Sequence, residues 1–209
     1  MSPDVTRDDI SFLKRVSEEA RYAPLLGGRY LVMWGSVVTV AYLCQYLILS
    51  GTLGWPQWTI LPMWAVVMAV AAVCMALFGR TMARKPGNQA LSNQVEKWVW
   101  TSAGFGIGAY AAGTFFAVAL SGAPTLLFDL IVAVALAGYG GAFLVVSHIS
   151  GQTWMRRPAI GSFVGAGIIP FYAGTHETYL VGAGIIFAVA VLPGLVLLRA
   201  EPATLPREA

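Results

Sequence analysis

The chain has 209 residues, of which 57% are hydrophobic and 11% are charged, and its mean hydropathy is +0.70. These values lie outside the usual range for a soluble globular domain and are typical of a protein that folds in lipid. The formal charge is +3, but the basic residues stand in short segments between apolar runs. Membrane topology explains them better than binding of nucleic acid does, so we expect the lipid bilayer, and no nucleic acid, as a partner.

The first 28 residues form a charged segment ahead of the apolar runs. Thr6 begins a sequence that resembles a capping box, and Ile10, Leu13 and Val16 then recur at roughly helical spacing. This pattern predicts a short cytoplasmic amphipathic helix at the inner membrane surface. The alternative is a helix that docks a soluble partner or a second protomer. We do not expect a signal peptide, because the segment has no apolar core and no small-residue cleavage site.

Six apolar runs follow, each close to the roughly 20 residues that a transmembrane helix needs. The predicted spans are 30–50, 58–78, 98–120, 124–146, 158–174 and 178–198. Lipid offers no hydrogen-bond partners to the backbone, and the runs lack the polar alternation of barrel strands. We therefore predict an all-α, polytopic membrane protein. Its expected parts are an N-terminal cytoplasmic segment (1–28), a six-helix bundle (29–199) and a cytoplasmic tail (200–209).

The basic residues orient this bundle. All 13 Lys and Arg fall before the first span, between the second and third, between the fourth and fifth, or after the last. The other connections, 51–57, 121–123 and 175–177, contain none. Because basic loops stay in the cytoplasm, we predict that both termini are cytoplasmic. The expected location is the inner membrane of a bacterial-type cell, with the chain crossing it several times.

Small residues form ridges along the third to fifth spans. Ridges of this kind let helices approach closely in lipid, where packing drives helix association. Tight packing within the chain is the favoured interpretation, and a homo-oligomer or a contact with another membrane subunit is the alternative. The residues expected in helix packing are Gly104, Gly108, Gly141 and Gly161.

Asp129 is the one acidic residue clearly inside an apolar run. An ionisable residue in hydrocarbon is costly, which makes it a candidate functional residue. It also stands near the start of the fourth span, where the helix dipole stabilises an anion, and we favour that structural role. The alternative is a cation or proton site in an outward-facing vestibule, in which case Asp129→Asn should abolish transport or sensing without affecting folding. The residues at matching depth are Gln45, Tyr46 and Tyr172.

Two prolines interrupt the last two spans. Pro170 and Pro193 lack the N–H that would bond the carbonyl four residues back. With Gly165 and Gly167 nearby, the short fifth span is the best candidate for a kinked or broken helix. A packing kink is the favoured interpretation, and an exposed backbone that binds ions, as in transporters, is the alternative.

The sequence predicts no metal site and no cofactor. His148 and His176 fall at opposite membrane surfaces, so they cannot ligate one haem, and His176 lacks neighbours that would complete a zinc site. An ordinary interfacial role is favoured for His176, and pH sensing at the outer surface is the alternative. We find no enzyme motif, and a non-enzymatic role is favoured.

Two functions compete. The first is an integral inner-membrane protein that serves as an accessory, sensor or regulatory subunit through helix–helix interactions. The second is a small transporter or channel component that uses an outward-facing polar site near Asp129 and the kinked fifth helix. A transporter should have a polar cavity that reaches the membrane midplane, whereas an interaction subunit should be packed throughout.

Overall fold

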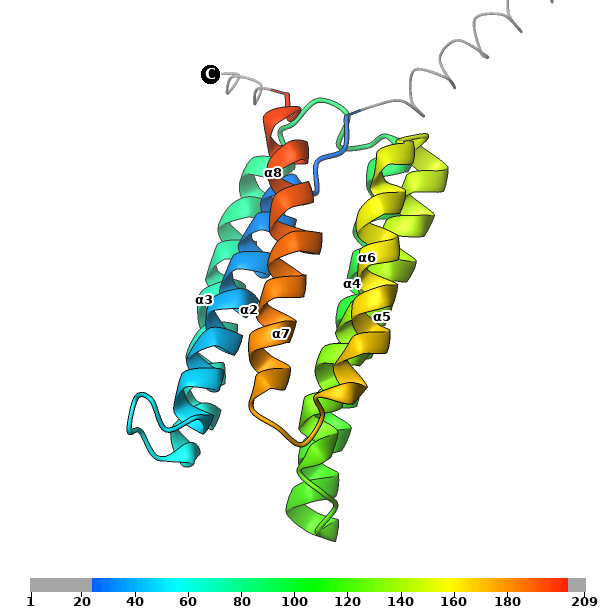
Figure 1. The fold of residues 1–209 in the computed structure, drawn as a ribbon. Helices are drawn as coiled ribbons and strands as arrows, with labels where there is room; N and C mark the ends of the chain where they lie inside the picture. The colour runs from blue at the N-terminus through cyan, green and yellow to red at the C-terminus, as the bar shows by residue number, and fades with distance from the viewer. Residues whose placement is uncertain (1–23, 203–209) are drawn as a thin grey trace, which may run out of the picture.

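The computed structural model of the protein describes residues 24–202, and these contain helices and no strand (Figure 1). The all-α prediction is therefore confirmed for this part of the chain. The predicted N-terminal amphipathic helix and the end of the predicted tail lie outside the described residues. The helices are α2 (Gly28–Leu49), α3 (Ile60–Met82), α4 (Leu91–Ser121), α5 (Leu126–Ser150), α6 (Arg156–Ile168), α7 (Glu177–Ile186) and α8 (Leu192–Arg199).

Five segments are long and apolar enough to cross a membrane: α2, α3 with its preceding turn, α4, α5 and the continuous stretch from α7 to α8. The exception is α6, which corresponds to the predicted fifth span. Its 13 residues extend about 20 Å, which is shorter than a bilayer core of roughly 30 Å. Short 3-10 turns at Thr153–Met155 and Ile169–Phe171 continue it at both ends. Five of the six predicted spans therefore meet the requirement.

The largest boundary difference is at α4. The predicted third span begins at residue 98, but α4 begins at Leu91, and the polar connection between α3 and α4 is reduced to residues 83–90. Polar residues in the first two turns of α4 are buried, which the hydropathy of the segment does not indicate.

The helices alternate in direction along the chain, with α7 and α8 forming one continuous stretch, so the basic segments gather at one end of the bundle (Figure 1). We call this the basic end, and we call the opposite end, with residues 51–56, 122–125 and 172–176, the bare end. The charge segregation seen in the sequence is thus a segregation in space. The described cations of the basic end are Arg29, Arg80, Arg84, Lys85, Lys97, Arg156, Arg157 and Arg199.

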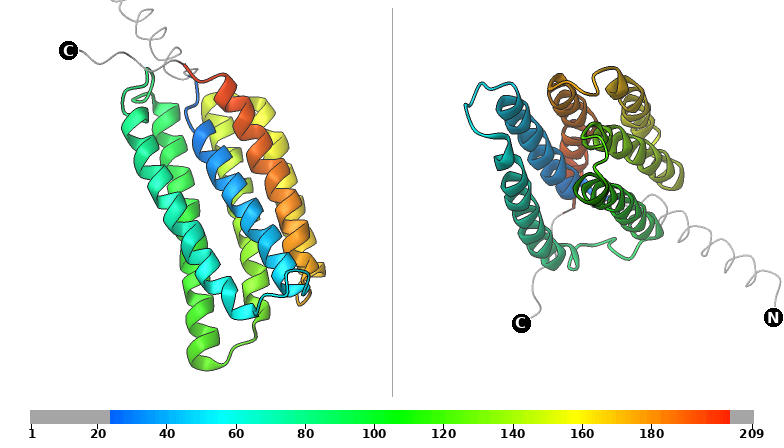
Figure 2. Two further views of the ribbon diagram at one scale, coloured as in Figure 1. Left: turned by 90° about the vertical axis from the view of Figure 1, so that its left-hand side faces the viewer. Right: turned by 90° about the horizontal axis from the view of Figure 1, so that it is seen from below.

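The helices form two sets of three that lie side by side (Figures 1 and 2). In one set, α2 packs against α3 and against the α7–α8 stretch; in the other, α5 packs against α4 and α6. The sets meet where α7 and the π-helical turn Phe187–Val191 contact α5 and α6. As a result, α3 and α4 each pack chiefly on one neighbour and stand at the edges of the bundle.

Glycines bring α2 and α8 into close contact. A Cβ atom on Gly28 would lie 2.6 Å from the backbone nitrogen of Leu198, and one on Gly194 would lie 2.8 Å from that of Val32. Both are shorter than side-chain contacts allow, so this crossing requires glycine. Close approach of this kind is how small residues stabilise helix pairs in lipid.

Helical irregularities occur at both prolines. Pro170 lies in the 3-10 turn that ends α6. Pro193 is the second residue of α8, directly after the π-helical turn Phe187–Val191. A π turn offers a way to accommodate the carbonyls that a proline leaves without a partner.

Candidate functional site

Asp129 lies at the bare end, in the first turn of α5, and only 9% of its surface is exposed. Its Oδ1 accepts a hydrogen bond of 2.6 Å from the Tyr179 hydroxyl on α7. Its Oδ2 accepts one of 2.8 Å from the backbone N–H of Gly174, which precedes α7 and has a φ of +91° that favours glycine. The carboxylate therefore joins α5 to α7 and to the loop before α7.

Of the predicted neighbours, Gln45 lies beside the residue that binds Asp129. Gln45 is buried on α2 and lies beside the hydroxyl of Tyr179. Its Oε1 accepts a hydrogen bond of 2.8 Å from the indole N–H of Trp64 on α3. A row of polar side chains thus runs from α5 through α7 and α2 to α3, with hydrogen bonds at its two ends. Tyr179 and Trp64 belong to this polar row, and the sequence did not predict them as neighbours of Asp129.

Tyr46 and Tyr172 take other roles at the same end. The Tyr46 ring packs against the His176 imidazole with their centroids 5.5 Å apart. The backbone carbonyl of Tyr172 accepts a hydrogen bond of 2.6 Å from the Thr178 hydroxyl, and its side chain is partly exposed. Within residues 24–202, neither tyrosine hydroxyl is hydrogen-bonded to Asp129. The structure thus brings Gln45 to Asp129 but gives Tyr46 and Tyr172 separate contacts.

Aromatic rings pack beside this row of polar side chains. Tyr42 packs edge-on against Trp64 at a centroid distance of 5.4 Å and at a tilt against Tyr179 at 5.7 Å. Both carboxylate oxygens of Asp129 already accept hydrogen bonds from groups of the protein, the Gly174 N–H and the Tyr179 hydroxyl. Chemically, this arrangement suits a cross-link between the two helix sets.

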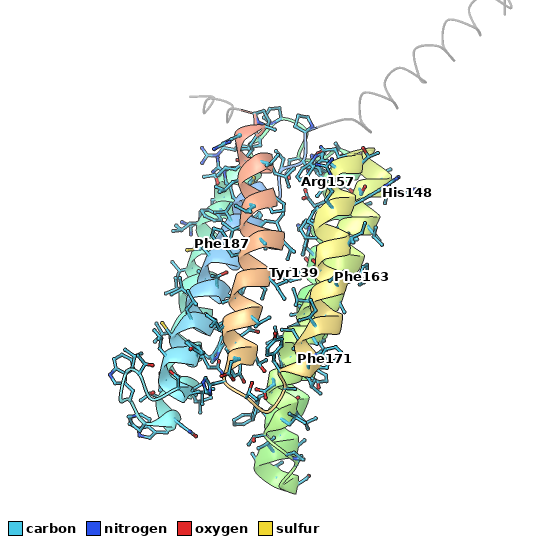
Figure 3. All side chains as sticks on the ribbon, in the orientation of Figure 1. Tyr139, His148, Arg157, Phe163, Phe171 and Phe187 are labelled. Atoms are coloured by element: carbon cyan, nitrogen blue, oxygen red, sulfur yellow. The ribbon has the colours of Figure 1, made fainter. Side chains whose placement is uncertain are left out.

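The two histidines lie at opposite ends of the bundle. His148 lies at the basic end, in the last turn of α5 (Figure 3). His176 precedes α7 at the bare end, where its Nε2 lies 3.1 Å from Glu177 Oε1 and both side chains are largely exposed. Sensing of pH by His176 stays a prediction.

A second polar cluster, which sequence reasoning missed, lies at the basic end. Asn93, on α4, accepts a hydrogen bond of 3.0 Å from the Leu26 N–H and donates others to the carbonyls of Pro24 and Gly87. One turn later, Glu96 Oε2 accepts a hydrogen bond of 3.1 Å from the Gly27 N–H. These side chains fix residues 24–27 against the start of α4.

Ion pairs connect the chain beyond α8 to the same end. Glu201 Oε2 lies 2.8 Å from Arg29 Nε, and Oε1 lies 3.2 Å from Lys85 Nζ. Lys85 Nζ also donates a hydrogen bond of 2.6 Å to the Pro202 carbonyl. The side chains of Lys85 and Glu201 are almost fully buried, so each charge depends on its partner. The start of α2, the α3–α4 connection and the end of the last helix are thereby held together.

Unpaired polar atoms line the buried face of α4 next to this cluster. Ser92 Oγ, Glu96 Oε1 and Trp100 Nε1 lack hydrogen-bond partners among the described residues. The three residues are four apart, so they follow one another along a single helix face. The predicted spans leave Ser92 and Glu96 in the connection before residue 98, and therefore give no sign of this column.

The glycine ridges differ in what surrounds them. Apart from the backbone of its own helix, a Cβ on Gly104, Gly108 or Gly141 would meet no atom of residues 24–202 within 4 Å. On α6, one on Gly161 would lie 3.2 Å from Val189 Cγ1 and one on Gly165 2.7 Å from Ile185 Cγ2. Packing within the chain therefore uses the α6 ridge and leaves the α4 ridge free. Gly167, on α6, also meets nothing within 4 Å.

Burial of the whole helices follows the same division. In an apolar 18-residue stretch of each helix, 6% is buried in α3 and 6% in α4, compared with 44% in α2 and in α5 and 50% in the α7–α8 stretch. The edge helices α3 and α4 therefore present most of their surface to whatever surrounds the bundle.

Comparison of the chain with known protein families, with curated proteins and with solved structures finds no match.

Proposed function

We propose that the chain is an integral inner-membrane protein that acts as a non-enzymatic accessory, sensor or regulatory subunit through helix–helix contacts. Its contact surface would be the α4 face that carries Gly104 and Gly108. The observation that carries the proposal is that, within residues 24–202, no atom apart from the neighbouring backbone of α4 comes within 4 Å of a Cβ at either position.

The geometry of α4 supports this surface. Gly104, Gly108 and Ala112 follow at intervals of four residues and are all exposed. The adjacent face packs on α5, where a Cβ on Gly138 would lie 3.7 Å from Ala103 Cβ. A stripe of small residues facing lipid leaves a shallow groove with few dispersion contacts, whereas a partner helix fills it and brings the backbones together.

A second copy of the chain is the occupant that we propose. Two copies inserted in the same direction present their α4 helices in parallel, which is the arrangement of helix dimers with this spacing of small residues. Contact of one stripe with the same stripe on its partner forms a closed two-fold interface. The edge position of α4 leaves this face accessible without rearrangement of the bundle.

Transport through a site at Asp129 has less support. Both oxygens of the carboxylate accept hydrogen bonds from the protein, and the Tyr42 ring packs against Tyr179 and Trp64 beside them. The structural role of Asp129 explains these contacts without a transported ion.

The test is the oligomeric state of the protein after extraction in mild detergent, measured by native mass spectrometry. The wild type should be dimeric, and the double variant Gly104→Leu, Gly108→Leu should be monomeric because the leucines hold the backbones apart. Gly167→Leu is the matched control, since Gly167 is also exposed with nothing within 4 Å, and it should remain dimeric. A monomeric wild type, or a double variant that is still dimeric, would contradict the proposal.

The proposed orientation has both termini in the cytoplasm, and its support is the positive-inside distribution of Lys and Arg. Reporter fusions after Ala209 and within residues 83–90 should both give a cytoplasmic signal. A periplasmic signal from either fusion would overturn the orientation.

A further inference from the structure

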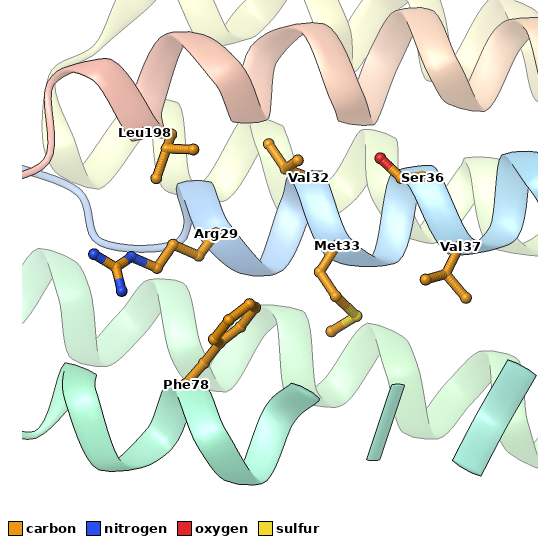
Figure 4. A pocket seen from close by; sticks show the side chains of 7 residues that line it. All are labelled: Arg29, Val32, Met33, Ser36, Val37, Phe78 and Leu198. Carbon is orange, nitrogen blue, oxygen red and sulfur yellow. The ribbon is translucent and has the colours of Figure 1, made fainter. Parts of the chain in front are cut away.

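A hollow of about 320 Å³ lies between α2, α3 and α8 near the basic end (Figure 4). It opens to the outside of the bundle along the apolar helices, and all but two of its lining side chains are apolar. The lining residues are Arg29, Val32, Met33, Ser36, Val37, Phe78 and Leu198.

Arg29 closes the end of the hollow that is nearest the basic end. Its Nε is held by Glu201 at 2.8 Å, and within residues 24–202 its side-chain hydrogen bonds are confined to that nitrogen. The side chain is 29% exposed, and in Figure 4 the guanidinium extends past the apolar residues. The two terminal nitrogens therefore remain able to donate to an anion, and a guanidinium matches the geometry of phosphate oxygens.

We propose that this hollow binds an anionic phospholipid, with one acyl chain against the apolar walls and the phosphate on Arg29. An apolar groove with a cation at one end has the polarity of an amphiphile. Basic pockets between transmembrane helices bind the headgroups of acidic lipids. A free phosphate would not use the apolar walls, and a helix, roughly 10–12 Å across with its side chains, is too wide for a hollow of this size.

The local charges favour an anion over a zwitterion. Arg29 and Lys85 share the single carboxylate of Glu201, so this ion-pair group contains one more cation than anions. Lys85 is almost fully buried, and Arg29 is therefore the member that a headgroup reaches. A phosphodiester without a compensating ammonium completes the charge balance.

The test measures lipid retention by native mass spectrometry of the purified full chain with added phosphatidylglycerol or phosphatidylcholine. The wild type should retain phosphatidylglycerol in preference to phosphatidylcholine. Arg29→Gln, which removes the guanidinium, should bind phosphatidylglycerol at least about tenfold more weakly. Ser36→Phe should have a similar effect, because its ring fills the hollow.

Matched controls separate the site from general effects. Arg157→Gln removes an exposed cation at the basic end, on α6, and should leave binding unchanged. Val40→Phe adds the same ring on an exposed position of α2 outside the hollow and should also have no effect. Glu201→Gln breaks the ion pair but keeps the guanidinium, so retention of phosphatidylglycerol should persist.

Three results would each overturn the proposal. Equal retention of the two lipids by the wild type would show that no headgroup is recognised. Wild-type retention by Arg29→Gln or Ser36→Phe would place any bound lipid elsewhere. Loss of phosphatidylglycerol in Glu201→Gln as complete as in Arg29→Gln would assign the effect to the broken ion pair.

Discussion

Replacement of Asp129 tests whether its carboxylate is a structural cross-link. In Asp129→Ala, the Tyr179 hydroxyl and the Gly174 N–H both lose their acceptor. In Asp129→Asn, the amide oxygen can accept from Gly174 while the amide nitrogen donates to the tyrosine oxygen, so both contacts persist without the charge. The alanine variant should therefore be the more damaging of the two.

The expected size follows from these two bonds. A hydrogen bond to a charged group contributes about 1.5–3 kcal/mol in soluble proteins, and interhelical bonds in membranes average about 0.6 and reach about 1.7 kcal/mol. Because Asp129 is buried but stands in the first turn of its helix, we take about 1–2 kcal/mol for each bond. Asp129→Ala should then lower the free energy of unfolding by about 2–4 kcal/mol, and Asp129→Asn by about 1 kcal/mol.

The assay is equilibrium unfolding in detergent micelles, combined with a double-mutant cycle. Tyr179→Phe should cost about 1–2 kcal/mol alone and little more in the Asp129→Ala background, because the shared bond is already gone. Glu177→Ala is the control, since its carboxylate is exposed at the same end, and it should lower the free energy of unfolding by less than about 0.5 kcal/mol. A loss below about 0.5 kcal/mol in Asp129→Ala, the scatter of ordinary surface substitutions, would refute the cross-link.

Two further predictions concern the basic end and the α2–α8 crossing. Asn93→Ala removes the three hydrogen bonds to Pro24, Leu26 and Gly87, so it should speed hydrogen exchange at the Leu26 amide and lower the free energy of unfolding by about 2–3 kcal/mol. Gln94→Ala is the control, because the hydrogen bond of Gln94 to Gln89 is exposed, and it should change neither quantity. Equal exchange rates in the two variants would contradict the prediction. Gly194→Ala places a Cβ 2.8 Å from the Val32 nitrogen and should lower the free energy of unfolding by about 1–3 kcal/mol. In contrast, Gly184→Ala, with nothing within 4 Å, should raise it by up to about 1 kcal/mol; a stable Gly194→Ala would show that the crossing is looser than described.

The helices and their alternation could be predicted because lipid demands long apolar runs and leaves charge to the connections. The limits of that reasoning show at α6 and α4. The run 158–174 is apolar, but Pro170 and the positive φ at Gly174 end regular helix early. At α4, polar residues extend the helix beyond the apolar run because residues 24–27 cover them. Hydropathy reports what a segment is compatible with, not where its helix ends.

The candidate sites were predictable only where a charge contrasted with its apolar surroundings. Asp129 stood out for that reason, and Gln45 was recognised at the same depth. Tyr179 and Trp64 did not stand out, because their rings count as apolar and their polar atoms matter only when a partner faces them. The contacts of Glu96 and Glu201 join residues 69 and 172 positions away in the chain, and no local pattern indicates such pairs.

The α4 and α6 ridges show why a motif in a membrane helix does not identify its partner. Gly104 and Gly108 have the same spacing as Gly161 and Gly165, yet the second pair packs against Val189 and Ile185 while the first meets no other helix among the described residues. Lipid tails are as apolar as leucine, so hydropathy cannot distinguish a face that meets lipid from one that meets a helix. The position of the helix in the bundle decides this. Because α6 lies between α5 and the last helix whereas α4 lies at an edge, no helix among residues 24–202 covers the α4 ridge, and we propose that a second copy of the chain does.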